Sequence, residues 1–201
     1  MKTIGIIDYG VGNLRSIQKA FEYNNIVAII SSDIVKLKAC DKLVLPGVGA
    51  YAECRNMLDK SFGNDLMILL KEKPVLGICV GMQLLFNYSL EFGKTNGFGL
   101  IDGFVDRLET KQLPVPHAGW NQIKIIQDSP LFNNIKNQSF FYFTHSYKCN
   151  VQSSENIISL VVYEGEFCCA VCKNKIYGVQ FHPEKSGDIG LKVLNNFYEY
   201  C

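Results

Sequence analysis

The sequence predicts an α/β fold, in which a central, mostly parallel sheet is flanked by helices and antiparallel strands are added in the C-terminal half. Two observations predict this class. Up to about residue 98, short apolar runs alternate with stretches of helical periodicity, as in parallel sheets. Beyond it, strand-like runs follow one another with little helix between them. At 201 residues and 48% hydrophobic content, the chain can bury one sizeable core, so we expect a single domain over residues 1–201.

The first half supplies the predicted parallel strands, which are short apolar runs at residues 3–7, 27–30, 42–45 and 75–78. The spacing of Leu14, Ile17 and Phe21 predicts a helix over residues 14–23, with Asn13 as its N-cap. A second helical stretch covers roughly residues 51–70, and a third apolar helical pattern follows Gly81. Sites in such folds lie at the carboxyl ends of the strands.

The second half is dominated by predicted strands, at residues 103–108, 121–126, 139–143, 157–163, 166–173 and 175–181. Gly165 separates two of these runs and indicates a hairpin. Residues 187–200 close the chain as a helix, because Ile189, Val193, Leu194 and Phe197 form one apolar stripe.

Composition excludes several classes of protein. The formal net charge is +1 without a long run of either sign, so nothing indicates binding to nucleic acid or to a membrane surface. No apolar run approaches the roughly 18 residues that a membrane span needs. The apolar run near the N-terminus ends at Asp8, which does not fit a signal peptide. The eight cysteines are irregularly spaced, so we expect free thiols and a cytoplasmic location.

Two patterns that would indicate a cofactor or metal fail. Gly10 and Gly12 follow a strand, but Arg15 stands where a dinucleotide fingerprint needs its third glycine. Cys169 and Cys172 form one Cys-x-x-Cys pair without a second pair or a nearby histidine, which is a weak zinc pattern. In a strand, Cys168 and Cys172 would share one face and Cys169 would point to the other. We therefore expect neither a metal nor a cofactor.

Cys79 is the candidate nucleophile. It lies between a predicted strand and a predicted helix, with Gly77 and Gly81 on either side. Such a turn is sharp, places its apical side chain clear of the sheet, and needs small neighbours. The helix N-terminus behind it favours a thiolate. A buried structural cysteine is the alternative for this short pattern taken alone.

A thiol nucleophile needs a base, and the chain has three histidines, at positions 117, 145 and 182. His182 follows a strand-like run, and Glu184 lies two residues on, where an extended chain held by Pro183 would turn it to the same side. Glu184 could then orient His182 as the third member of a triad. A surface histidine beside an unrelated glutamate is the plain alternative, but the presence of Cys79 favours the triad.

Acyl transfer also needs donors for a developing oxyanion. Residues 46–49 (PGVG) end another predicted strand and offer backbone N–H groups with glycine freedom to reorient. A plain turn explains this segment equally well.

Three segments together resemble the class I (triad) glutamine amidotransferases: residues 77–83 (GICVGMQ), 181–186 (FHPEKS) and 46–49. Three more resemble the branch of this family that forms the glutaminase subunit of imidazole glycerol phosphate synthase, at residues 8–14 (DYGVGNL), 116–121 (PHAGWN) and 142–147 (YFTHSY). The resemblance covers essentially the full chain, and the combination is specific although each part is not. It implies a flavodoxin-like fold.

The resemblance implies a glutaminase. Cys79 would attack the side-chain amide of glutamine, His182 would protonate the leaving ammonia, and water would hydrolyse the glutamyl thioester to glutamate. Matched positions imply that glutamine is bound by Gly49, Gln83, Glu91, Ser146 and Tyr147, with oxyanion donors near Val48 and Gly49 that form after a peptide flip.

The resemblance also implies a partner. Ammonia would pass to a separate (β/α)8-barrel cyclase subunit in a heterodimer with lyase activity, giving imidazole glycerol phosphate and aminoimidazole carboxamide ribotide in histidine biosynthesis. Positions matching that interface are Asn13, Trp120, Asn121, Tyr142 and Lys185. Without the family, a core position would be expected for Trp120, the only tryptophan.

Two alternatives remain open from the sequence. The same triad could supply ammonia to a sugar amidotransferase in surface-polysaccharide biosynthesis, because glutaminase chemistry does not depend on the acceptor. Ala118, where many relatives carry methionine, marks a departure close to the expected interface. A cysteine hydrolase of other chemistry or a binding module would be favoured by replacement of Cys79 or His182, and both are present.

Overall fold

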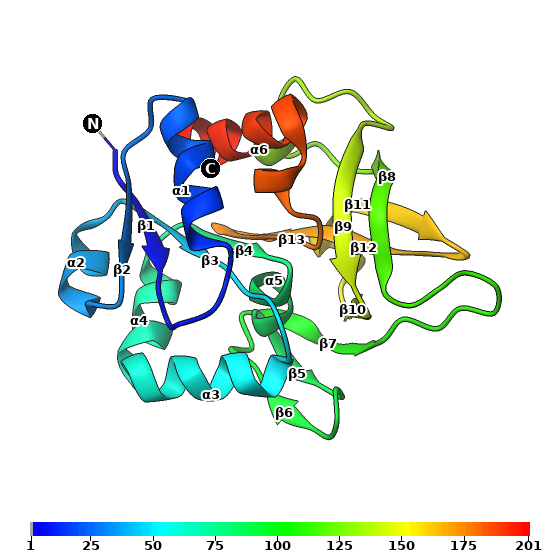
Figure 1. The fold of residues 1–201 in the computed structure, drawn as a ribbon, viewed down its shortest axis with the longest axis horizontal. Helices are drawn as coiled ribbons and strands as arrows, with labels where there is room; N and C mark the ends of the chain where they lie inside the picture. The colour runs from blue at the N-terminus through cyan, green and yellow to red at the C-terminus, as the bar shows by residue number, and fades with distance from the viewer. Residues whose placement is uncertain (1) are drawn as a thin grey trace.

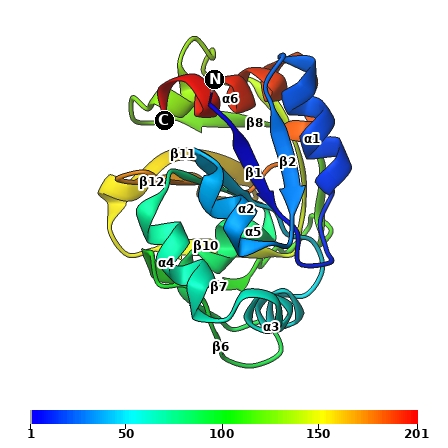
Figure 2. The same cartoon turned by 90° about the vertical axis from the view of Figure 1, so that its left-hand side faces the viewer.

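A computed structural model describes residues 2–201 as a large mixed sheet with helices on both faces (Figure 1). One face carries α1 (Leu14–Tyr23) and α6 (Gly187–Tyr200), and the other carries α3 (Tyr51–Phe62), α4 (Asn64–Glu72) and α5 (Val80–Leu84). The view turned by 90° shows these two groups on opposite sides of the N-terminal strands (Figure 2). Each helix buries an apolar stripe against the sheet, which is how a doubly wound fold closes its core.

The N-terminal strands are parallel, as predicted. They are β1 (Ile4–Ile7), β2 (Ala28–Ser31), β3 (Lys42–Leu45) and β4 (Val75–Ile78), and the late strand β13 (Ile176–Val179) joins them. Their order β2-β1-β3-β4-β13 is that of the flavodoxin-like doubly wound sheet. All residues of β1, β3, β4 and β13 are buried, because helices cover both faces.

Mostly antiparallel strands extend the sheet beyond β13. The path continues as β12-β10-β7-β5-β6, with β11 between β12 and β8, and with β9 beside β8. These strands are β5 (Phe86–Ser89), β6 (Thr95–Asn96), β7 (Ile101–Arg107), β8 (His117–Ile125), β9 (Phe140–His145), β10 (Tyr147–Val151), β11 (Ile157–Tyr163) and β12 (Gly165–Lys173). The predicted fold class is therefore confirmed.

Element boundaries were predicted unevenly. The helices α1 and α6 and the strands β3, β4 and β11 have the predicted bounds, whereas β5, β6, β10 and the short helix α2 (Ile34–Ala39) were missed. The prediction of one helical stretch over residues 51–70 was wrong. It breaks at Gly63, whose φ of +54° reverses the chain between α3 and α4.

Two predicted turn features differ in detail. Asn13 lies at the N-cap position of α1, but its side chain makes no capping hydrogen bond. Its amide instead donates to Glu184, far along the chain. The hairpin between β11 and β12 exists, yet its left-handed residue is Glu164 (φ +58°), while Gly165 already pairs with Tyr163.

Cys168 and Cys169 are buried in β12, and the eight cysteines of the chain are free thiols. Within residues 2–201, no group of three His, Cys, Asp or Glu side chains is close enough to hold a metal ion. A search of the same residues finds no helix with the length and apolar character needed to cross a membrane.

Three glycines let the turn at Cys79 pack onto the end of β3. A Cβ on Gly81 would lie 1.8 Å from the carbonyl oxygen of Leu45, and one on Gly77 would lie 2.7 Å from the carbonyl oxygen of Gly81. A Cβ on Gly47 would lie 2.7 Å from the backbone nitrogen of Gly81. Since these contacts are with backbone, the neighbours cannot move aside cheaply. The segment after β3 is thus held directly against the turn.

Substitution of Gly81 by alanine should therefore disrupt the fold. We expect Gly81→Ala to lower the free energy of unfolding by at least about 3 kcal/mol, the upper range for overpacking, or to prevent folding. Gly165→Ala is the control, because a Cβ there has no neighbour within 4 Å; it should change stability by less than about 1 kcal/mol. Urea unfolding monitored by circular dichroism compares the two, and equal stabilities would contradict this packing.

Candidate active site

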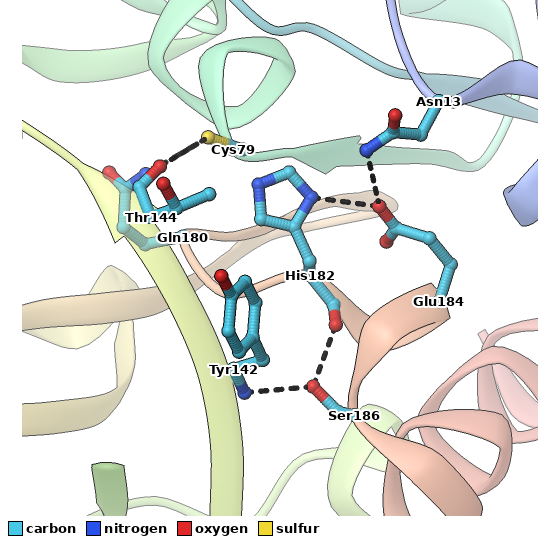
Figure 3. Close-up of polar contacts among 8 residues, drawn as sticks. All are labelled: Asn13, Cys79, Tyr142, Thr144, Gln180, His182, Glu184 and Ser186. Carbon is cyan, nitrogen blue, oxygen red and sulfur yellow. Dashed lines mark hydrogen bonds and ion pairs between the residues drawn. The ribbon is translucent and has the colours of Figure 1, made fainter. Parts of the chain in front are cut away.

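Cys79 occupies a strained turn between β4 and α5. Its φ of +55° and ψ of −114° lie outside the regions that non-glycine residues favour, and such strain concentrates at functional sites. The backbone N–H of Cys79 donates to the Val179 carbonyl at 2.8 Å, which ties the turn to β13. Its sulfur lies 3.8 Å from the Thr144 carbonyl oxygen and 3.7 Å from Nε2 of Gln180 (Figure 3). The thiol thus lies against polar groups from the ends of two strands, β9 and β13.

His182 lies opposite Cys79 and is fixed by its backbone. Its N–H donates to the Tyr142 carbonyl at 2.9 Å, and its carbonyl accepts from the Ser186 hydroxyl at 2.6 Å. The Ser186 hydroxyl also accepts from the N–H of Tyr142 at 3.0 Å, which closes a small ring of contacts between β9 and the segment after β13 (Figure 3).

Glu184 contacts His182, as predicted, but not through an extended chain. Residues Pro183–Lys185 form a 3-10 turn, which folds the Glu184 carboxylate back onto the ring. Its Oε1 lies 2.8 Å from Nδ1 of His182 and 3.5 Å from Nδ2 of Asn13. The side chains of His182 and Glu184 are 2% and 1% exposed, so this is a buried charge pair. The prediction of contact was right and that of an extended backbone was wrong.

The surroundings of His182 favour its charged form. Burial opposes a charge on the ring, but the nearby sulfur of Cys79 and the hydrogen-bonded carboxylate of Glu184 outweigh it and raise the pKa of His182 to about 10. Within residues 2–201 its Nε2 has no hydrogen-bond partner at normal distance. In Figure 3 the ring lies between Cys79 and the Glu184 carboxylate. An imidazolium held in this position can donate a proton to a group bound beside the thiol.

A pocket of about 330 Å³ opens over Cys79. Eight residues predicted for catalysis, oxyanion stabilisation or substrate binding line it: Val48, Gly49, Cys79, Gln83, Glu91, Ser146, Tyr147 and His182. These residues come from segments spread over more than half of the chain. Pro116, Thr144 and His145 also line the pocket and were not predicted.

The segment after β3 offers a free backbone donor. The Val48 carbonyl accepts from the Cys54 thiol at 3.3 Å, and because a trans peptide points its C=O and N–H in opposite directions, the N–H of Gly49 faces the other way. No hydrogen bond within residues 2–201 uses that N–H. Gly49 has a φ of +90°, a conformation that only glycine adopts readily.

Gln83 and Glu91 are both held in place by backbone groups. Nε2 of Gln83 donates to the Tyr147 carbonyl at 3.1 Å and to Oε1 of Gln180 at 3.0 Å. Glu91 accepts from the N–H of Tyr51 at 2.7 Å, and burial raises the pKa of its carboxyl. Gln180 is fully buried beside the thiol and was missed; its position two residues before His182 was the available signal.

The residues predicted for a partner interface gather beside this site. Trp120 is 56% exposed, so the core position expected without the family was wrong. Its ring meets that of Tyr142 edge-on at 6.1 Å, and Nζ of Lys185 lies 5.8 Å from the centre of the Tyr142 ring. Asn121 follows Trp120 in β8 and donates to the Val162 carbonyl. Asn13 reaches inward to Glu184 instead.

A thiol in a pocket, an imidazolium opposite it, a carboxylate behind the ring and a free N–H nearby can together transfer an acyl group. The sulfur would attack a carbonyl carbon as the thiolate, the protonated ring would give its proton to the leaving group, and the free N–H could donate to the developing oxyanion.

Comparison with known proteins agrees with this chemistry. The family model "Glutamine amidotransferase class-I" matches residues 5–200. The chain is 47% identical to imidazole glycerol phosphate synthase subunit HisH of Chlorobium luteolum, over 96% of this chain and 98% of that protein. It is 46% identical to the protein of the same name in Methanosarcina barkeri, over the full length of both. The solved structure of PurLQS from Thermotoga maritima contains a chain of the same fold, with a TM-score of 0.74, 17% identity, and coverage of 99% of this chain and 98% of that one. The chain belongs to the class-I glutamine amidotransferase family.

Proposed function

We propose that the chain is a glutaminase that uses Cys79, His182 and Glu184 as a triad. The observation that carries this proposal is the strained turn at Cys79 facing a buried His182–Glu184 pair across a pocket. The sulfur attacks the side-chain amide carbon of glutamine as the thiolate, the carbon–nitrogen bond breaks, and the protonated His182 gives its proton to the leaving ammonia. Water then attacks the thioester while His182 takes up the proton of the water, which releases glutamate and restores the pair of thiolate and imidazolium.

The pocket suits an amino acid. Its volume of about 330 Å³ lies at the small end of ligand sites. Gln83, Glu91, Ser146 and Tyr147 supply polar groups that can bind the two ends of glutamine, together with the backbone of Gly49. The N–H of Gly49, at the Val48–Gly49 peptide, is the oxyanion donor in this scheme, in an orientation that a peptide flip could gate.

The ammonia goes to a partner. Relatives that match over nearly their full length are named subunits of imidazole glycerol phosphate synthase, which favours that synthase over sugar amidation in polysaccharide assembly. In this proposal the single domain of residues 1–201 pairs in the cytoplasm with a (β/α)8-barrel cyclase subunit of histidine biosynthesis. The contact is formed by the exposed Trp120 and Lys185 with the half-buried Tyr142 and Asn121, and Asn13 lies at its inner edge.

Replacement of the nucleophile tests the chemistry. Cys79→Ala should lower glutamate release by at least about 10³-fold, the scale on which loss of a nucleophile acts. The complex with the cyclase should still use ammonium salts, because that reaction belongs to the other subunit. Cys172→Ser, a half-buried cysteine outside the pocket, is the matched control and should keep wild-type turnover. Glutamine turnover by Cys79→Ala would remove Cys79 from the mechanism.

The raised pKa of His182 predicts how stability depends on pH. The folded pKa of about 10 exceeds the ordinary value of 6.5, so the folded state binds this proton more tightly than the unfolded state. The resulting contribution to stability is complete below about pH 6.5 and is lost as pH rises towards 10. The difference in unfolding free energy between wild type and Glu184→Gln should therefore shrink over this range in urea titrations. A difference independent of pH would mean that Glu184 does not hold the proton on His182.

The partner is tested by glutamate release from the purified chain alone, then with a histidine-pathway cyclase subunit, with and without the cyclase substrate. We expect the cyclase with its substrate to raise turnover at least about tenfold, equivalent to a lowering of the activation free energy by about 1.4 kcal/mol. Trp120→Ala should weaken this stimulation without changing turnover by the chain alone. Stimulation only by a sugar-amidating enzyme would keep the triad and change the pathway.

A further inference from the structure

Two buried histidines outside the proposed triad are joined to each other beside the pocket. Nδ1 of His117 lies 3.0 Å from Nε2 of His145, and Nδ1 of His145 lies 2.8 Å from the carbonyl oxygen of Tyr147. At the other end, Nδ2 of Asn121 lies 3.3 Å from Nε2 of His117. These contacts form a continuous path from β8 to the pocket wall, where His145 lies.

The Tyr147 carbonyl fixes the proton positions along this path. A carbonyl oxygen only accepts, so Nδ1 of His145 carries the hydrogen and Nε2 is the acceptor of the neutral ring. His117 must then donate from Nδ1, which leaves its Nε2 to accept from the Asn121 amide. Burial disfavours a charge on either ring and lowers the pKa of His145 to about 3 and that of His117 to about 4. Both rings are therefore neutral near pH 7.

The same carbonyl orients Gln83. It accepts from Nε2 of Gln83, whose second N–H goes to Gln180. Both hydrogens of the Gln83 amide are thus used inside the protein, and no hydrogen bond within residues 2–201 uses its Oε1. Since Gln83 lines the pocket, this oxygen is the atom that can accept from an N–H group of a bound molecule. Nε2 of Gln180 continues the network to the sulfur of Cys79, 3.7 Å away.

Packing holds the outer histidine in one place. The ring of His117 is 3% exposed and stacks between Phe143 and Tyr163, with centroid separations of 4.8 and 4.1 Å. An apolar ring would fill this aromatic slot without any need for polar partners, whereas a buried imidazole requires them. Packing alone therefore does not explain a histidine at the centre of an aromatic stack, and its hydrogen bonds do.

We propose that His117 and His145 are positioning residues of this site, which hold the Tyr147 carbonyl, and through it the Gln83 amide, in the orientation that receives glutamine. The inference rests on the glutaminase function proposed above. Neither ring takes part in proton transfer to the substrate. Their contribution is to keep the Gln83 oxygen turned into the pocket, so their loss acts on substrate binding more than on turnover.

The kinetic test compares His117→Phe with His117→Asn in the full chain. Glutamate release is assayed under the condition, the chain alone or with the cyclase, in which the wild-type protein is active. His117→Phe keeps the stack but cannot donate. We expect its KM for glutamine to rise about five- to tenfold, the scale of one hydrogen bond, with kcat changed by less than about threefold. His117→Asn places an amide N–H near the position of Nδ1 and should bring KM back to within about threefold of wild type.

Tyr163→Phe is the matched control, because it keeps the ring stacked on His117 and removes only a hydroxyl that donates to the Pro114 carbonyl. It should have the wild-type KM. Wild-type KM in His117→Phe would overturn the proposal. Equal KM values in His117→Phe and His117→Asn would also overturn it. A loss of thermal stability and kcat without a change in KM would do the same, because it would indicate that His117 acts through packing alone.

The tautomers provide a test that needs no variant. Long-range proton–nitrogen NMR spectra of the 15N-labelled chain should show both His117 and His145 with hydrogen on Nδ1, although the free imidazole side chain prefers hydrogen on Nε2. Hydrogen on Nε2 of either ring would refute this hydrogen-bond path, even if the wild type releases glutamate. Absence of glutamate release in every state would instead refute the proposed function, and with it the role in glutamine binding.

Discussion

The site depends on the close backbone contact between the end of β3 and the turn at Cys79. Because Gly81 has no Cβ, the first turn of α5 rests on the Leu45 carbonyl, and Gly47 lies against the same turn. This contact fixes the thiol relative to the segment that carries the free N–H of Gly49. One packing constraint thereby holds the Cys79 turn against the segment of a free backbone N–H that lies far from it in sequence.

The His182–Glu184 pair matters more for the protonation of His182 than for the stability of the fold. Removing two charged groups from water costs free energy that their attraction only partly returns. Here Oε1 of Glu184 accepts from His182 and Asn13, while within residues 2–201 its Oε2 has no partner. An apolar pair of the same size would pack there at lower cost. The charged pair helps to raise the pKa of His182 above its ordinary value, so the ring keeps its proton near neutral pH, directly across from the thiol.

Local sequence patterns predicted the features that depend on neighbouring residues, namely most strands and helices and the residues of the short motifs. Apolar periodicity located the parallel strands and the long helices, and short motifs placed Cys79, His182 and Glu184 together. Periodicity could not show the break at Gly63, since a helix on either side of it has the same apolar spacing. It also could not show the role of Gln180, because only the fold brings that amide between Gln83 and the thiol.

The amide of Asn13 shows how a contact between distant parts of the chain replaces a local one. As an N-cap it would have stabilised α1 locally, yet it gives up that bond and reaches Glu184, 171 residues away. Asn121 similarly contacts His117 and so stands at the head of a hydrogen-bond path that ends at Cys79. Asn13 comes near the cluster of Trp120 and Tyr142 only through the fold, whereas Asn121 is the sequence neighbour of Trp120. A protein bound over that cluster would therefore meet groups already linked, by hydrogen bonds, to the carboxylate behind His182 and to the amide beside the thiol.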